Sequence, residues 1–262
     1  MRQRFILAAS AVCVFCAQPA DAQNVHDLAA YLGTVLTTAG ASPVVDAPML
    51  GDSVNVLSVQ GLYTHLTFGD FGDLGPVGSV RADAFGGAVE ASFLGGRLGI
   101  GANAAYIVPD CPIGFECRGN ASAGGSAIVR LANAAVGDSA GRVTLSVRTA
   151  GSWSFDAGSD RYASATVGAP IAFSAREGHY RILAFGAPGI AWGSLKTKTF
   201  VNPQTGELGP FDHSGARGML SGGIGFLPDR AGVGVQIGFQ KIFVSQAGAQ
   251  YGAALTWSGL FQ

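Results

Sequence analysis

The sequence predicts an all-β fold, an antiparallel up-and-down β-barrel of about ten strands, with about eight also possible, and one short N-terminal α-helix. Three observations predict it. Apolar and polar residues alternate with the period of a strand over most of the chain, the connections between these segments differ systematically in length, and aromatic residues collect near both ends of the apolar faces. Only 13% of the residues are charged and 40 of 262 are Gly, but the 48% hydrophobic content and the sustained alternation favour a folded chain over a low-complexity one.

The N-terminus has the features of a secretory signal. Arg2 and Arg4 precede an apolar run over residues 5–17, and Ala20-Asp21-Ala22 is a small-x-small cleavage site. The apolar run is too short to cross a bilayer as a helix. We therefore predict that residues 1–22 are a cleaved signal peptide and that the chain is exported. No later apolar run is long enough for a transmembrane helix, which leaves a membrane barrel or a secreted soluble β domain.

Ten segments from Val54 onward alternate as strands do. They are 54–68, 77–94, 97–108, 122–136, 142–155, 161–175, 179–195, 215–227, 232–244 and 249–261. The connections at 95–96, 137–141, 176–178 and 228–231 are short, and all the long connections, among them 109–121 and 196–214, belong to the other set. Outer-membrane barrels have short periplasmic turns and longer external loops, whereas a soluble sandwich has no reason to sort its loops. The sequence therefore predicts a transmembrane barrel with the long loops outside.

The aromatic residues are predicted to form two girdles. Those near the external rim are Tyr106, Trp153, Phe155, Trp192 and Tyr251, and those near the periplasmic rim are Phe93, Phe173, Tyr180, Trp257 and Phe261. A globular core would place large aromatic rings at its centre, where they bury the most area. Rings at both rims with small aliphatic residues between them indicate a surface that faces a bilayer.

Residues 24–38 have the period of a helix. The apolar residues recur three and four positions apart, at Val25, Leu28, Leu32, Val35 and Leu36. Two interpretations fit: a plug or periplasmic partner surface, or a short helix that closes the periplasmic mouth, which we favour. Residues 39–53 are rich in Pro, Gly and Ala and predict a linker, so that a segment of helix and linker, 23–53, precedes a barrel over 54–262.

The last stretch, 249–262, alternates over its whole length and carries the one motif of the chain. Its positions Gln250, Gly252, Leu255, Trp257 and Phe261 resemble the C-terminal assembly signal of bacterial outer-membrane β-barrels. Phe261 is penultimate, where that family usually ends on its aromatic residue. At the level of pattern, residues 54–262 resemble the small opacity-type and porin-like barrels of diderm bacteria. The resemblance implies a monomer in outer-membrane lipid, inserted by the barrel-assembly machinery through its C-terminal strand.

Several charged residues are predicted to face the lumen: Glu90, Arg130, Arg142, Arg148 and Arg217, together with Asp83. Glu90 has the opposite parity to Asp83, so we expect a bulge at Gly86-Gly87 that turns Glu90 inward. These charges indicate either a selective pore or interior ion pairs that fill a narrow barrel. We favour the second, because about eight strands leave room only for side chains and aqueous channels need about sixteen.

Cys111 and Cys117 lie in the predicted external loop 109–121. Export places them in an oxidising compartment, so we expect a disulfide between them. A metal site would need two further ligands, and no His or other Cys is near in the sequence. We expect neither a metal nor a cofactor.

Asp212-His213-Ser214, at the end of loop 196–214, is the place where a His-based external active site could lie. Adjacent residues of a regular strand point in opposite directions, so His213 and Ser214 cannot form a nucleophile–base pair there. We interpret the three as solvated loop residues and do not predict an enzyme.

The sequence does not identify one activity. Lys and Arg number 16 against 17 Asp and Glu, so no basic excess exists for nucleic-acid binding. We expect a structural or surface-interaction role, in membrane integrity or adhesion, for an outer-membrane barrel. The alternative is a narrow porin for small solutes; an outer-membrane enzyme and a secreted soluble β-barrel or sandwich are the remaining hypotheses.

Overall fold

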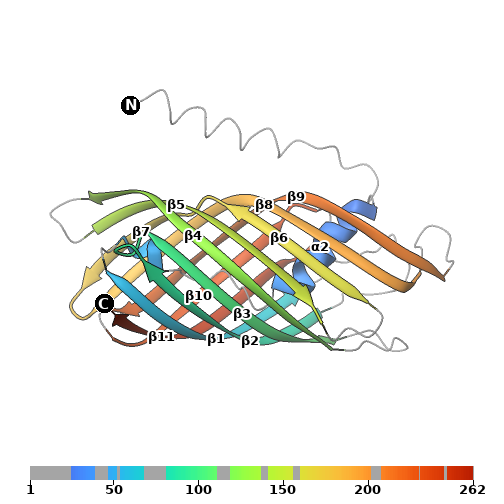
Figure 1. The fold of residues 1–262 in the computed structure, drawn as a ribbon, viewed down its shortest axis with the longest axis horizontal. Helices are drawn as coiled ribbons and strands as arrows, with labels where there is room; N and C mark the ends of the chain where they lie inside the picture. The colour runs from blue at the N-terminus through green and yellow to red at the C-terminus, as the bar shows by residue number, and fades with distance from the viewer. Residues whose placement is uncertain are drawn as a thin grey trace, which may run out of the picture.

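A computed structural model describes residues 25–38, 47–51, 54–67, 81–110, 119–136, 141–155, 160–201, 208–229, 231–244 and 247–261. The chain forms a closed antiparallel β-barrel (Figure 1), which confirms the predicted fold class. The predicted signal peptide, 1–22, and the two loop cysteines, Cys111 and Cys117, lie outside the described residues.

The barrel wall is built from strands that pair with their neighbours in chain order. They are β1 (Asn55–Thr67), β2 (Arg81–Phe93), β3 (Leu98–Asp110), β4 (Asn120–Val136), β5 (Gly141–Ser154), β6 (Arg161–Gly168), β7 (Ile171–Glu177), β8 (Tyr180–Val201), β9 (Leu208–Pro228), β10 (Gly232–Ile242) and β11 (Ala249–Phe261). The pairing of β1 with β11 closes the sheet. Because β6 and β7 both lie between β5 and β8, the wall has ten strand positions.

One predicted strand is interrupted. The sequence predicts a single strand over 161–175, but the chain leaves the ladder at Ala169 and Pro170 and resumes as β7. Proline has no backbone N–H to donate, which explains the break. The backbone N–H of Ala169 donates to the carbonyl of Pro188 at 2.9 Å and that of Ser146 to the carbonyl of Pro170 at 2.9 Å, so the wall stays closed there.

The predicted loop 196–214 is mostly strand. β8 runs to Val201 and β9 begins at Leu208, and their pairing continues with one register shift between Thr197 and Phe200. Beyond the hydrocarbon a strand needs no apolar outer face, so the polar residues that suggested a loop do not end the pairing.

The two ends of the barrel differ. One end of the barrel holds the turns at 94–97 and 178–179, the start of β1 and the end of β11, and we call it the turn end. The opposite end, where β1, β3, β5, β8 and β10 finish, is the loop end.

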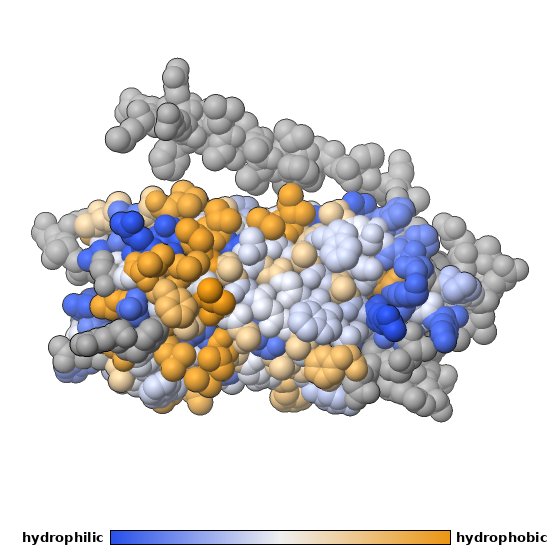
Figure 2. All heavy atoms as spheres, viewed as in Figure 1, coloured by the Kyte–Doolittle hydropathy of each residue, from blue (hydrophilic) through white to orange (hydrophobic). Residues whose placement is uncertain are grey.

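The polarity of the wall is that of a membrane barrel. Large apolar side chains point outward along every strand, and Ile237 in the middle of β10 is 56% exposed. Serine, threonine and glutamine side chains are buried on the inner face. Figure 2 shows hydrophobic residues gathered over the half of the visible face nearer the turn end, with hydrophilic residues at both ends of the barrel. A water-soluble barrel would have the reverse arrangement.

Aromatic side chains project from the outer face near both ends, as the sequence predicts. At the loop end these include Tyr106, Trp153 and Tyr251, all exposed. At the turn end Tyr180 stacks on Phe226 with ring centroids 4.4 Å apart. Rings at these two levels match the headgroup regions of a bilayer.

The register of β2 corrects one prediction. The pairing of β2 with β1 and β3 is continuous, so the bulge expected at Gly86-Gly87 is absent. Glu90 faces the lumen by regular alternation, and Asp83 faces outward instead. There it accepts a hydrogen bond from the Tyr63 hydroxyl at 2.7 Å and lies 3.0 Å from Nδ1 of His65. A register shift does occur in β4, between Arg130 and Ala132.

Candidate functional site

The lumen is occupied by the chain's own N-terminal part. The helix α2 (Val25–Thr38) lies inside the barrel in its loop-end half, packed on β6, β8 and β9 (Figure 1). Ala29, Ala30 and Val35 are completely buried. The expectation that this helix closes the periplasmic mouth is therefore wrong, and the plug interpretation is the one that the structure supports. We call α2 the plug. Among the described residues, no helix is both long and apolar enough to cross a bilayer.

The backbone of the plug touches the backbone of the wall. A Cβ atom on Gly33 would lie 2.5 Å from the backbone N of Ser194. Cβ atoms on Gly193 and Gly215 would run into the carbonyl oxygens of Ala30 and His26. Glycine at these three positions is therefore required for the helix to lie as close to β8 and β9 as it does.

Polar contacts hold the plug at both of its ends. Asp27, in the first turn, forms an ion pair with Arg217 of β9. The macrodipole favours a carboxylate at that position. Nδ1 of His26 lies 2.8 Å from the carbonyl oxygen of Ser214. At the other end, the hydroxyl of Thr37 donates to that of Ser164 on β6 at 2.6 Å.

An aromatic anchor joins the plug to the far wall. Tyr31 is almost completely buried in a cluster that includes Ile107, Met219 and Ile242. Burial raises the pKa of its hydroxyl, which hydrogen-bonds the backbone of Gly248. A neutral phenol in this position crosses the lumen from the β8–β9 side toward the strands opposite.

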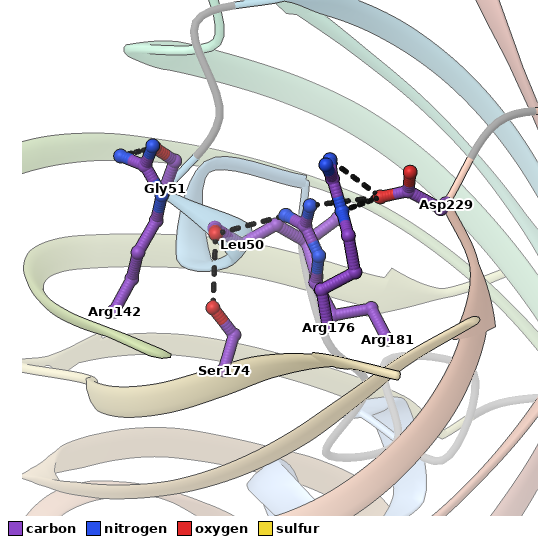
Figure 3. A network of polar contacts seen from close by, with 7 residues as sticks. All are labelled: Leu50, Gly51, Arg142, Ser174, Arg176, Arg181 and Asp229. Carbon is purple, nitrogen blue, oxygen red and sulfur yellow. Dashed lines mark hydrogen bonds and ion pairs between the residues drawn. The ribbon is translucent and has the colours of Figure 1, made fainter. Parts of the chain in front are cut away.

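A second element, the strap, blocks the turn-end half of the lumen. It consists of the 3-10 helix η2 (Ala47–Leu50) and Gly51, part of the region predicted as a linker. Its last three carbonyls accept hydrogen bonds of 2.8–3.3 Å from five inward side chains. The donors are Thr144 to Met49, Ser174 and Arg181 to Leu50, and Asn133 and Arg142 to Gly51 (Figure 3).

Arg181 ties the strap to the turn end. While Nη1 donates to Leu50, Nη2 lies 3.0 Å from Oδ1 of Asp229. Arg176 binds the same carboxylate oxygen through Nε at 2.8 Å (Figure 3). Arg181 is only 5% exposed, so Asp229 supplies the charge that this buried guanidinium needs.

Side chains fill the remaining space. Met49 of the strap packs on Ile128, Leu183 and Leu227 of the wall. On the β10–β11 side, where the plug does not lie, buried amides pair: Gln240 donates to Gln250 at 3.0 Å, and Gln236 to Thr256 at 2.8 Å. The cavity beside Met49, Arg148 and Gln240 measures about 30 Å³, room for about one or two water molecules. The plug, the strap and these side chains thus occupy much of the lumen among the described residues.

The charged residues predicted to face the lumen have specific places in this arrangement. Arg217 holds the plug, Arg142 holds the strap, and Arg148 borders the small cavity. Arg130 donates to the carbonyl of Gly95 at 3.2 Å near the turn end. Glu90 is 5% exposed.

Sequence reasoning missed the partners of these arginines and missed Arg181 altogether. Arg142 donates to a backbone carbonyl of the strap and Arg217 pairs with the plug. Arg181 binds both the strap and Asp229 of the wall. One feature of the sequence could have indicated that another part of the chain fills the lumen. The inward residues are small, and glycine and serine cannot fill a lumen by themselves.

The residues of the predicted assembly signal all lie on β11. Gln250 faces inward and pairs with Gln240, whereas Leu255 and Trp257 face outward. Gly252 pairs with Thr64 and Gly238 in the register, and Phe261 is the last residue of the strand. Recognition by the assembly machinery remains a prediction.

Asp212, His213 and Ser214 do not converge. Asp212 faces outward and pairs with Lys196, Nζ to Oδ2, at 2.5 Å. His213 faces the plug, and its ring meets that of His26 edge-on with centroids 5.5 Å apart. In the described part of the chain, no three His, Cys, Asp or Glu side chains lie close enough together to hold a metal ion.

No family model matches the sequence, and no curated protein matches it either. Solved structures with a similar fold include the outer membrane protease OmpT of Escherichia coli, at 11% identity and a TM-score of 0.37, covering 80% of this chain and 97% of that one. The N-terminal β-barrel domain of Pseudomonas aeruginosa OprF has 6% identity and a TM-score of 0.35, covering 78% and 96%.

A third similar structure is the translocator domain of the autotransporter NalP from Neisseria meningitidis, at 12% identity and a TM-score of 0.39, covering 92% of this chain and all of that one. These structures share the architecture of small bacterial outer-membrane β-barrels and differ in what they do. The closed lumen of this chain has to be interpreted from its own contacts.

Proposed function

We propose that this protein is a closed outer-membrane β-barrel with a structural or surface-interaction role. The observation that carries the proposal is the occupied lumen: the plug and the strap fill both halves of the barrel and are held by side chains of the wall. A wall that commits five buried or partly buried donors to the strap is built for closure, not for passage.

In this proposal the signal peptide over 1–22 directs export and is cleaved, and the assembly machinery recognises β11. The barrel resides as a monomer in outer-membrane lipid of a diderm bacterium, with the loop end outside. The outward aromatic and aliphatic side chains and the absence of excess charge support contact with lipid and no role with nucleic acid. The loops at the outer end are the surface available for adhesion.

Two measurements test the proposal. The purified chain should migrate differently in gels when boiled and unboiled, because a barrel whose sheet is closed stays folded in detergent until it is heated. In planar bilayers the same preparation should give no stable conductance steps. Recovery in the soluble periplasm with identical migration would refute the membrane barrel, and steady steps from the wild-type chain would refute closure.

A narrow pore is the second candidate, and one observation favours it. The inner face of β5 carries small residues, among them Ser146 and Ser152, both buried. If the wild-type chain conducts, Ser146→Trp or Ser152→Trp should abolish the steps, because the bulky ring would occupy any path beside the helix. Conduction that these substitutions leave unchanged would place the current outside this lumen.

A further inference from the structure

We propose that withdrawal of the plug and strap turns this closed barrel into an anion-selective passage. The inference goes beyond the proposed function, which concerns the closed state, and it rests on that function only in taking the wild-type chain as closed. Three features of the described residues support it: the size of the wall residues, the partners of the arginines, and the point where the segment is attached.

The first feature is that the plug, not the wall, fills the loop-end half. Several wall residues beside the helix are small, among them Ala191, Gly193, Ser164 and Gly215, whereas larger ones such as Leu195 and Met219 pack on its side chains. A helix with its side chains is about 10–12 Å across. Because the small residues cannot close such a gap, we expect departure of the helix to leave a water-filled space beside them.

The second feature is that the N-terminal segment supplies acceptors to three wall arginines. Asp27 pairs with Arg217, the carbonyl of Leu50 accepts from Arg181, and the carbonyl of Gly51 accepts from Arg142. When the segment leaves, these acceptors leave with it. Arg181 keeps its ion pair with Asp229 of the wall. Guanidinium groups stay protonated at all relevant pH values, so the charges of Arg142 and Arg217 would face water inside the barrel.

Two further arginines share the lumen, so the wall keeps a positive surplus. Arg148 borders the small cavity and Arg130 lies near the turn end. Among the described wall residues, the carboxylates on the lumen side are Glu90, Asp229, which Arg176 and Arg181 already bind, and Asp160, which interacts with Tyr162. Pores lined by arginine or lysine select anions. Small inorganic anions and organic phosphates or carboxylates are the solute class that this lining fits.

The third feature is the attachment of the segment. The strap precedes β1 in the chain and lies near the turn end, and the described residues of the segment contribute no strand to the wall. It can therefore leave through the turn-end mouth without breaking a strand pairing. While the segment is docked, the ion pair and the hydrogen bonds described above hold it in the lumen.

The test uses full-length variants in planar bilayers. Gly215→Val places a side chain where the plug backbone lies, and valine suits a strand. Thr144→Val and Ser174→Ala remove strap donors without changing an arginine. The matched control is Gly186→Val on β8, where a Cβ atom meets nothing within 4 Å.

The triple variant should give stable conductance steps and a zero-current potential of the sign expected for anion preference in a KCl gradient. The control should stay as silent as the wild type. Adding Arg142→Gln and Arg217→Gln to the triple variant should reduce the anion preference at least severalfold. Heat-modifiable migration shows that each variant has formed its barrel. Maleimide labelling of an added Ala29→Cys substitution, at a completely buried position of the plug, shows that the plug has left, and the same substitution in the otherwise wild-type chain should stay unlabelled.

A labelled, barrel-forming triple variant that stays silent, or that prefers cations, would overturn the inference. Conduction by the wild type would instead refute the proposed closed function. If the triple variant does not form a barrel, a locked chain provides the test. Thr37→Cys with Ser164→Cys replaces hydroxyl oxygens that lie 2.6 Å apart. At a urea concentration that leaves the barrel intact, conductance steps should appear when this disulfide is reduced and vanish when it is oxidised. Conductance steps that are the same in both states would overturn the inference.

Discussion

The hydroxyl of Thr37 on the plug donates a hydrogen bond of 2.6 Å to the hydroxyl of Ser164 on β6, which in turn lies 3.0 Å from the hydroxyl of Ser152 on β5. Three hydroxyl groups thus form a chain from the plug into two neighbouring strands. All three residues are buried, so no water replaces a lost member at low cost.

We expect Thr37→Val to lower the stability of the docked plug by about 1 kcal/mol, because it removes the donor and keeps the volume. The measurement is hydrogen exchange of the α2 amides in the micelle-bound barrel. A double-mutant cycle with Ser164→Ala isolates the pair. Strictly additive effects of the two substitutions would mean that this contact carries no energy of its own.

Arg181→Gln should destabilise the barrel by about 1.5–3 kcal/mol, since it removes charged hydrogen bonds from a buried site. Arg176 binds the same oxygen of Asp229 but its side chain is 55% exposed, so Arg176→Gln should cost less than about 1 kcal/mol. Equilibrium unfolding in urea from lipid vesicles gives both values. Equal losses for the two variants would contradict the anchoring role of Arg181.

Gly99→Ala and Gly61→Ala should change stability in opposite directions. A Cβ atom on Gly99 would lie 2.7 Å from Oε1 of Glu90 and 2.7 Å from Cγ2 of Ile128, whereas one on Gly61 meets nothing within 4 Å. We expect a loss of about 1–3 kcal/mol at Gly99 from overpacking and a gain of about 0.5–1 kcal/mol at Gly61. The same urea titration measures both, and a harmless Gly99→Ala would show that the lumen is looser than its contacts indicate.

Ile237→Arg should cost about 2–4 kcal/mol of folding free energy in a bilayer, because the residue faces lipid at the middle of β10. Leu94 is 73% exposed in the turn between β2 and β3, and Leu94→Arg there should cost no more than about 1 kcal/mol. Folding into vesicles of defined thickness gives the comparison. A small penalty at Ile237 would place the hydrocarbon elsewhere on the barrel.

The cysteines at 111 and 117 provide a test of topology that needs no structure of their loop. If the loop is external and bridged, Cys111 and Cys117 should resist a membrane-impermeant maleimide on intact cells until a reductant is added. A His-tagged outer-membrane protein labelled on a native periplasmic cysteine provides the control for intact envelopes. Labelling that needs permeabilised cells would invert the assignment of both barrel ends.

The strands and the directions of their side chains could be predicted from the sequence. In a strand that alternates over its whole length, only one of the two faces is apolar enough to lie against lipid. Gly86-Gly87 shows the limit of this reasoning. Two adjacent glycines and an apparent parity conflict indicate a bulge, yet Asp83 simply lies outside near the loop end, hydrogen-bonded to Tyr63. At the end of a strand, beyond the hydrocarbon, an outward charged side chain costs little free energy. Alternation is therefore a poorer guide there to which side chains face inward.

The position of the plug could not be predicted from its own residues. The apolar face of 25–38 fits a lumen as well as a mouth, and the distinction depends on Gly193 and Gly215, far away in the sequence. The strap is a still harder case. Its binding groups are the backbone carbonyls of Met49, Leu50 and Gly51, which every residue possesses and no sequence pattern displays.

The plug is far away in the sequence from the strands on which it packs, and this distance has a consequence for the order of folding. Residues 25–38 precede every described strand in the chain, but the glycines against which they pack, Gly193 and Gly215, belong to β8 and β9, far toward the C-terminus. Contacts of such long separation form late and slowly. Closure of the wall, which joins β1 to β11, therefore has to take place around a helix already inside, or leave a hollow intermediate whose lifetime is set by how fast the helix finds its way in.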